Sequence, residues 1–157
     1  MKTTDRAVLI ISLLLVIAGS NYAQAADIDA LHEGLGDALN AQDVDAVMSY
    51  FHDDATYDFA ALPGVMEGKE QIRAFFEEIF AGFPDFHVEH RNKLISGNIL
   101  ITECTITATH LGVLYEVPGT GNPVQIIHTD MYEIEGGKIK RMVTYDDAAS
   151  LLVQMGV

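Results

Sequence analysis

The spacing of apolar residues changes once along this chain, and that change restricts what the chain can fold into. In the first part, apolar residues recur every three to four positions, as on one face of a helix. After Pro84 the chain becomes rich in Val, Ile, Thr and Tyr, in runs separated by "SGN", "PGTGNP" and "EGG". Helices followed by a run of strands with short turns favour an α+β fold, in which the helices pack on one face of an antiparallel sheet.

The same pattern predicts the boundaries of the elements. Helices are expected over 27–40, 43–51, 68–80 and 148–155, with a short strand around Tyr57 and Phe59 among them. Longer strands are expected over 86–95, 98–117, 123–134 and 138–145. A long curved sheet wrapped around helices encloses a cavity, and such a cavity is a common ligand site.

The first 25 residues form a separate segment. Lys2 and Arg6 precede an apolar run over 7–18, and Ala23 and Ala25 form a small-residue cleavage frame. This pattern is typical of a secretory signal peptide, so we expect an exported protein, periplasmic or secreted, whose mature chain 26–157 is one domain. The alternative is a retained anchor, but the apolar run is shorter than the ~20 residues of a spanning helix. We therefore expect no stable membrane association after cleavage.

Charge and cysteine content narrow the classes of partner. The formal charge is −14 over 157 residues, and −15 once residues 1–25 are removed. Nucleic acid is excluded as an expected partner, because binding it requires a basic surface. The single cysteine, Cys104, cannot form an intramolecular disulfide. It lies inside an expected strand without a local cue for thiolate stabilisation, which favours a buried, inert thiol over a nucleophile.

A group of polar residues lies on the expected strand over 123–134. His128, Asp130 and Tyr132 are two positions apart, so their side chains share one face of the sheet. Burial would raise the pKa of such a carboxylate and a nearby imidazolium would lower it, which suits proton transfer to or from carbon. The alternative is a hydrogen-bonded pair that only stabilises the sheet. No metal site is expected, because the short ligand spacing of zinc or iron sites is missing.

The position of His110 relative to this group depends on the strand register. If the hairpin before the strand turns about Gly121, then His110 faces Tyr132 and Gly112 faces Asp130. In that register His110 belongs to the polar group, and Gly112 leaves room beside the carboxylate. A shift of one residue would undo this arrangement.

Three segments carry a resemblance to a known family. They are "ALNAQDVDAVMSYFHDDATYDF", "MEGKEQIRAFFEEIFAGFPDF" and "THLGVLYEVPGTGNPVQIIHTDMYEIEGGKIKRMVTYDD". In order and spacing they resemble the SnoaL-like polyketide cyclases and ester cyclases of the nuclear transport factor 2-like superfamily, over about residues 28–157. The resemblance implies a cone-shaped α+β fold with a pocket between the curved sheet and the helices, and a homodimer formed through the outer sheet face.

The resemblance also implies site residues. In this family an acid–base carboxylate follows the "GKI" turn by five residues, a position that Thr144 occupies here, with Asp130 at the second polar position. Thr144 cannot act as the base, so Asp130 is the expected catalytic acid–base residue. His128 or His110 is the expected orienting or second acid group, and Thr144 a hydrogen-bond donor to the substrate carbonyl. Asp147 is expected to cap the last helix, with a place in the pocket as the alternative, and Asp146 is expected to lie at the rim or act as a displaced acid. Further pocket residues are expected at His110, Tyr57, Tyr132 and Met142.

Two functions remain open from the sequence. The first is cofactor-independent acid–base catalysis of the cyclase or isomerase type on a small hydrophobic carbonyl compound, which the resemblance implies. The second is a binding module for an apolar ligand or a partner protein that kept the pocket and lost the catalytic acid, which Thr144 and the export signal favour. A hydrolase or dehydratase that uses Asp130 and a histidine on water is a weaker alternative.

Overall fold

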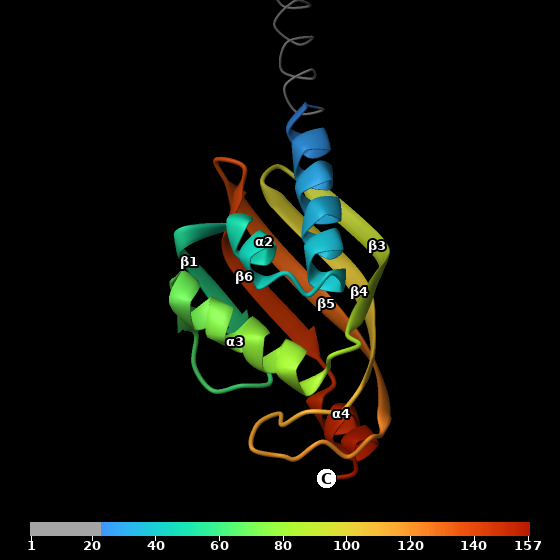
Figure 1. Cartoon of the computed structure of the whole chain (residues 1–157). Helices are drawn as coiled ribbons and strands as arrows, with labels where there is room; N and C mark the ends of the chain where they lie inside the picture. Colours follow the sequence, from blue (N-terminus) through green and yellow to red (C-terminus); the bar gives the residue numbers. More distant parts are fainter. Residues whose placement is uncertain (1–22) are drawn as a thin grey trace, which may run out of the picture.

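The computed structural model describes residues 23–157. Helices and strands follow the order expected from the sequence (Figure 1). The helices are one over 23–40, α2 (Val44–Ser49), α3 (Lys69–Gly82) and α4 (Ala148–Met155). The strands are β1 (Phe51–Phe59), β2 (Met66–Glu67), β3 (His87–Ser96), β4 (Ile99–Thr109), β5 (Pro123–Glu135) and β6 (Lys138–Asp146).

The strands form one sheet in the order β2-β1-β6-β5-β4-β3. Its last four strands in the chain are the expected antiparallel meander. The sheet as a whole is mixed rather than purely antiparallel, because β1 pairs in parallel with β6, with Tyr57 beside Met142 and Phe59 beside Thr144. β6 is the last strand of the meander, and β1 lies along the edge of β6 that the meander leaves unpaired.

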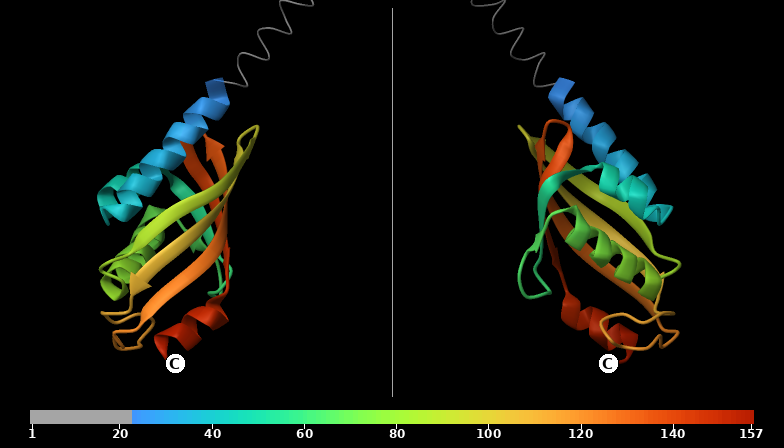
Figure 2. Two further views of the ribbon diagram at one scale, coloured as in Figure 1. Left: turned by 90° about the vertical axis from the view of Figure 1, so that its right-hand side faces the viewer. Right: turned by 60° about the vertical axis from the view of Figure 1, so that its left-hand side comes forward.

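The sheet is strongly curved, and the first helix and α3 cover its concave face (Figure 2). The α+β class and the pocket-forming architecture expected from the sequence are therefore confirmed. Residues of β5 alternate between buried and exposed, with Ile126, His128, Asp130, Tyr132 and Ile134 facing inward. The core includes the buried side chains of Leu35, Phe51, Ile72, Leu100, Ile139 and Met155.

Several boundaries differ from the expected ones. Phe51 begins β1 instead of completing the second helix, and the acidic residues that follow it lie within that strand rather than in a turn. The two-residue strand β2 was not predicted. The last helix was predicted with the observed bounds, and Asp147 caps it by accepting hydrogen bonds from the Ser150 N–H and hydroxyl.

The predicted register around His110 is wrong. In the structure Tyr132 pairs with Leu100 and Asp130 with Thr102, so neither His110 nor Gly112 lies opposite the polar group. The cause is a loop over 110–122 that leaves the sheet after Thr109.

The loop is anchored to the end of α3. The backbone N–H groups of Leu111 and Gly112 both donate to the carbonyl oxygen of Gly82. Gly112 is needed there because any Cβ would overlap the carbonyl oxygen of Ala81.

The predicted signal peptide, 1–25, lies almost entirely outside the described residues, and only 23–25 are seen, within the first helix. No helix within 23–157 has the length and apolar character needed to cross a membrane.

The loop anchor predicts the effect of a single methyl group. We expect Gly112→Ala to lower the free energy of unfolding by about 1–3 kcal/mol, the usual range for overpacking, because the loop must move off the end of α3. Urea unfolding measures this. Leu111→Ala, at an exposed neighbouring residue, is the control and should change stability by less than about 0.5 kcal/mol. Equal stability of both variants and the unsubstituted protein would contradict the anchor.

Candidate functional site

Strand pairing aligns the polar residues of the concave face in adjacent rows. One row runs from His90 on β3 through Cys104 and His128 to Asp146 on β6. In the next row Asp130 lies between Thr102 and Thr144. In the row after that, Tyr132 and Tyr57 flank Met142. Because alternate residues of each strand share a face, these rows bring together side chains that lie far apart in the sequence.

Asp130 lies at the centre of a buried hydrogen-bond network. Its Oδ2 accepts from Nε2 of His128 and from the Tyr132 hydroxyl, each at 3.0 Å. Its Oδ1 accepts from the Thr144 hydroxyl at 2.5 Å, and the Thr144 oxygen is 3.0 Å from the Tyr57 hydroxyl. Asp130 is only 4% exposed. A carboxylate buried this deeply requires such donors, since burying a charge without partners costs several kcal/mol.

His128 completes an ion pair with Asp130. Burial alone disfavours the imidazolium, but the hydrogen bonds and charges of Asp130 and Cys104 outweigh it and raise the pKa of His128 to about 10. At neutral pH His128 therefore carries its proton and lies against the carboxyl group of Asp130. Such a pair holds both a proton donor and a proton acceptor within one small, buried volume.

An apolar cavity lies against the network. Its wall combines the side chains of α3 and the loops with those of the sheet, and Asp130 and His128 form part of its surface. The apolar part is lined by Leu39, Phe59, Phe75, Phe76, Ile79, Phe83, Phe86, Val88, Ile106, Ile126, Met142 and Leu151. A pocket that is mostly apolar and has a few convergent polar groups is typical of small-molecule sites.

The predicted site residues divide into two sets. Tyr57, Tyr132, Met142, Thr144 and Asp146 line the cavity together with Asp130 and His128, and the Thr144 hydroxyl donates its hydrogen to Asp130.

His110 and Asp147 lie elsewhere. The buried His110 ring is next to Phe83, its Nδ1 is 3.2 Å from the Thr120 hydroxyl, and it does not line the cavity. Asp147 caps α4, which is the role that the sequence favoured for it.

Three residues that the sequence did not single out contribute to this region. His90 lines the cavity with its Nδ1 3.1 Å from the Cys104 sulfur, and Tyr115 reaches the cavity from the 110–122 loop. His32, on the first helix, packs against the His90 ring at 3.9 Å between centroids. No local sequence signal could have identified them, because each joins the site through a contact with a distant segment.

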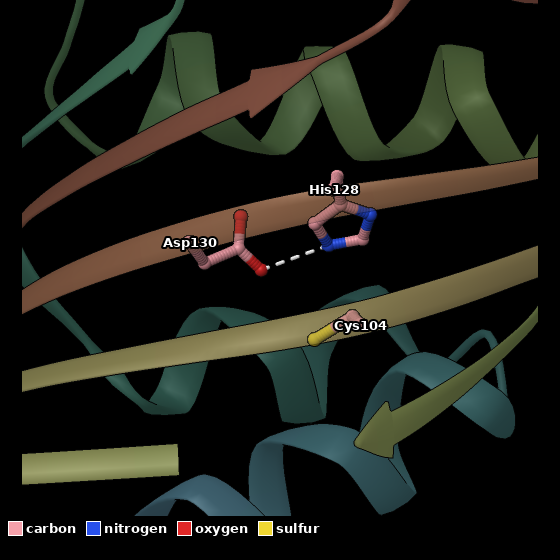
Figure 3. Close-up of side chains that lie close together, drawn as sticks. All are labelled: Cys104, His128 and Asp130. Atoms are coloured by element: carbon pink, nitrogen blue, oxygen red, sulfur yellow. Dashed lines mark hydrogen bonds and ion pairs between the residues drawn. The ribbon is translucent and has the colours of Figure 1, made fainter. Parts of the chain in front are cut away.

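Cys104, His128 and Asp130 also offer three ligand atoms within 4.8 Å of one another (Figure 3). A thiolate, an imidazole and a carboxylate are the donor types that zinc prefers, so this group has the chemistry to hold a divalent ion. The same three groups interact with one another, because His128 binds Asp130 directly and the Cys104 thiol, whose own burial opposes ionisation, has its pKa lowered by hydrogen bonds from His128 and His90. The expectation of no metal stays a prediction.

Comparisons with known proteins agree with this architecture. A family model described as SnoaL-like polyketide cyclase matches residues 30–155. A search of curated protein sequences found no match.

Solved structures share the fold at low identity. A SnoaL-like polyketide cyclase from Jannaschia sp. CCS1 is similar at a TM-score of 0.78 and 21% identity, covering 84% of this chain and 93% of that one. AclR from Streptomyces galilaeus, described as a hydroxylase, is similar at 0.75 and 21%, covering 83% and 82%. IdmH from Streptomyces antibioticus, described as a polyketide cyclase, is similar at 0.70 and 24%, covering 82% and 98%.

The buried His32 predicts sensitivity to acid. Burial, followed by the positive charges of His90 and Lys93, lowers the pKa of His32 from 6.5 to about 4, although Asp130 and Asp29 oppose this. The unfolded chain therefore binds the proton first, and stability is lost as pH falls from about 6.5 to about 4. In His32→Gln this loss should be smaller, as measured by urea unfolding across that range.

The exposed His87 provides the control for this experiment. His87→Gln should retain the acid sensitivity of the unsubstituted protein. If His32→Gln loses as much stability as the unsubstituted protein between these pH values, His32 is not the group responsible.

Proposed function

This chain belongs to the SnoaL-like polyketide cyclase family, and we propose that it catalyses acid–base chemistry of the cyclase or isomerase type on a small hydrophobic carbonyl compound. The observation that carries the proposal is the ion pair of His128 and Asp130, buried where it forms the polar wall of an apolar cavity. Apolar surroundings strengthen electrostatic interactions with a bound substrate and favour a ligand with a mostly apolar body.

The two groups can divide the proton transfers between them. Asp130 accepts a proton from the carbon next to the substrate carbonyl, and the electron pair of the broken C–H bond moves to form an enolate. His128, which is cationic, stabilises the oxygen of this enolate by hydrogen bonding or by donating its proton. In a cyclisation the enolate carbon then attacks a second carbonyl, and the new alkoxide takes up the proton that Asp130 accepted, which restores the carboxylate, while any proton given by His128 returns to it. In an isomerisation the proton returns to a different carbon.

Tyr132 and Thr144 position the base in this scheme. Both hydroxyls donate to Asp130, so they hold the carboxylate in one orientation and limit its freedom to turn away from the substrate.

A binding module without catalysis is the second candidate. It is favoured by the full engagement of Asp130, whose two oxygens already accept three hydrogen bonds from the protein. Thr144 at the position where the family resemblance places the catalytic acid favours it as well. In that case the cavity holds an apolar molecule and returns it unchanged.

Hydrogen exchange at carbon separates the two candidates. We expect the protein in D2O to accelerate deuterium incorporation next to the carbonyl of bicyclic aromatic ketones such as 1-tetralone, measured by NMR. Asp130→Asn should lower the rate by about two to four orders of magnitude, the usual contribution of a general base. Glu133→Gln, on the outward face of the same strand, should leave the rate unchanged.

The outcomes are distinct. A protein that binds such ketones without accelerating the exchange, and whose Asp130→Asn variant binds them equally well, is the binding module. Equal exchange rates in Asp130→Asn and the unsubstituted protein would remove Asp130 from the mechanism.

We further propose that the reaction needs no cofactor, since His128 and Asp130 supply both proton donor and acceptor. The same exchange assay tests this. Dialysis against EDTA should leave the rate unchanged, and a loss that zinc restores would instead assign the Cys104, His128 and Asp130 group to a metal.

Export and dimerisation also belong to the proposal. Export is supported by the signal-peptide pattern of residues 1–25, and a purified exported chain should begin at Ala26 by intact mass.

Dimerisation through the outer sheet face is supported by the exposed apolar side chains of Ile101, Ile127 and Tyr145 on that face. Light scattering should then give twice the mass of the mature chain, and a monomeric mass would contradict it.

A further inference from the structure

Within the described residues, three residues that line the cavity carry a buried polar atom without a hydrogen-bond partner: His90, whose ring packs against His32, and Tyr115 and Asp146. On Tyr115 and Asp146 these atoms are the hydroxyl and Oδ1. Buried polar groups are nearly always paired in folded proteins, so two unpaired groups on one cavity mark a place where a ligand or water completes the bonds.

The pKa of each of the two groups is shifted by its surroundings. Burial and then the negative charges of Glu78 and Asp146 raise the pKa of Tyr115, so its phenol remains a hydrogen-bond donor at neutral pH. Burial also raises the pKa of Asp146, although the positive charge of His128 opposes this. His128 is the cross-strand neighbour of Asp146, which places this second pair of groups directly beside the ion pair.

The backbone holds Tyr115 in place at a conformational cost. Tyr115 and Glu116 have φ values of 47° and 64°, a region that non-glycine residues rarely occupy. They form the centre of a tight turn in which Leu114 and Val117 exchange two backbone hydrogen bonds. The Tyr115 N–H donates to Glu78 of α3 at 3.1 Å. Strained turns of this kind concentrate at ligand sites, where neighbouring contacts hold them.

We propose that Asp146 and Tyr115 form a second polar subsite, which binds a hydroxyl group of the substrate beneath the 110–122 loop. A hydroxyl fits both groups at once, because it donates to the carboxylate and accepts from the phenol. A carbonyl would satisfy only Tyr115, and an aromatic amine, which is neutral and whose nitrogen is a poor acceptor, would satisfy only Asp146. This rests on the proposed function and refines its substrate class to a hydrophobic carbonyl compound that also carries a hydroxyl.

Matched ligands test the subsite without any need for turnover. The probes are 1-tetralone, the set of hydroxy-1-tetralones with the hydroxyl at each ring position, and the matching amino-1-tetralones, with dissociation constants measured by calorimetry. At least one hydroxy isomer should bind about tenfold or more tightly than 1-tetralone, as expected for a hydrogen bond to a charged group. The amino compound of the same position should gain less, because it donates to Asp146 but accepts poorly from Tyr115.

Variants assign the preference to the two residues. Tyr115→Phe and Asp146→Leu should each reduce the preference to threefold or less while 1-tetralone itself still binds. Tyr145→Phe is the matched control, because the exposed Tyr145 lies on the same strand and the opposite face, and it should keep the full preference. Thermal melts confirm that each variant is folded.

The result that overturns the subsite is separate from failure of the catalytic proposal. If every hydroxy isomer binds within threefold of 1-tetralone, or if the preference survives in both variants, then only water occupies these atoms. If the preference holds and the exchange assay shows no catalysis, the subsite stands in a binding protein.

Discussion

The buried charge of Asp130 is the constraint on which the rest of the site depends. A carboxylate at this depth is stable only when donors replace the lost water, and here they come from β5 and β6, with Tyr57 of β1 joined through Thr144. A shift of β6 by one residue would move Thr144 to the outer face and leave Oδ1 without its donor. The network therefore fixes the register of three strands as well as the orientation of the acid–base pair.

The family resemblance predicts an acid at the position of Thr144. The geometry of this sheet explains why a threonine is compatible with the site. Thr144 and Asp130 are direct cross-strand partners. Carboxylates at both positions would repel one another in a buried row, and one would have to be protonated. With one acid and one hydroxyl, the row holds a single negative charge, and His128 balances it.

Much of this arrangement follows from local sequence, and the remainder depends on distant contacts. The order of helices and strands, the bounds of α4 and the shared face of His128, Asp130 and Tyr132 follow from periodicity alone. The position of His110 does not, because it depends on where β4 ends, and that is decided by hydrogen bonds from the loop to Gly82. Tyr115 enters the cavity through a turn held by Glu78, a contact 37 positions away in sequence. Asp146 lines the cavity rather than its rim, a position that depends on its pairing with His128 across the strands.

The parallel pairing of β1 with β6 has a consequence for the time course of folding. Tyr57 and Thr144 are separated by 87 positions and still share one hydrogen bond, so the sheet cannot be completed until almost the whole chain is present. Contacts of this separation slow folding, because a long loop must be closed before they form. A chain with this topology stays open while its C-terminal strand is still being made, and an open chain is the form in which a polypeptide can pass through a narrow channel.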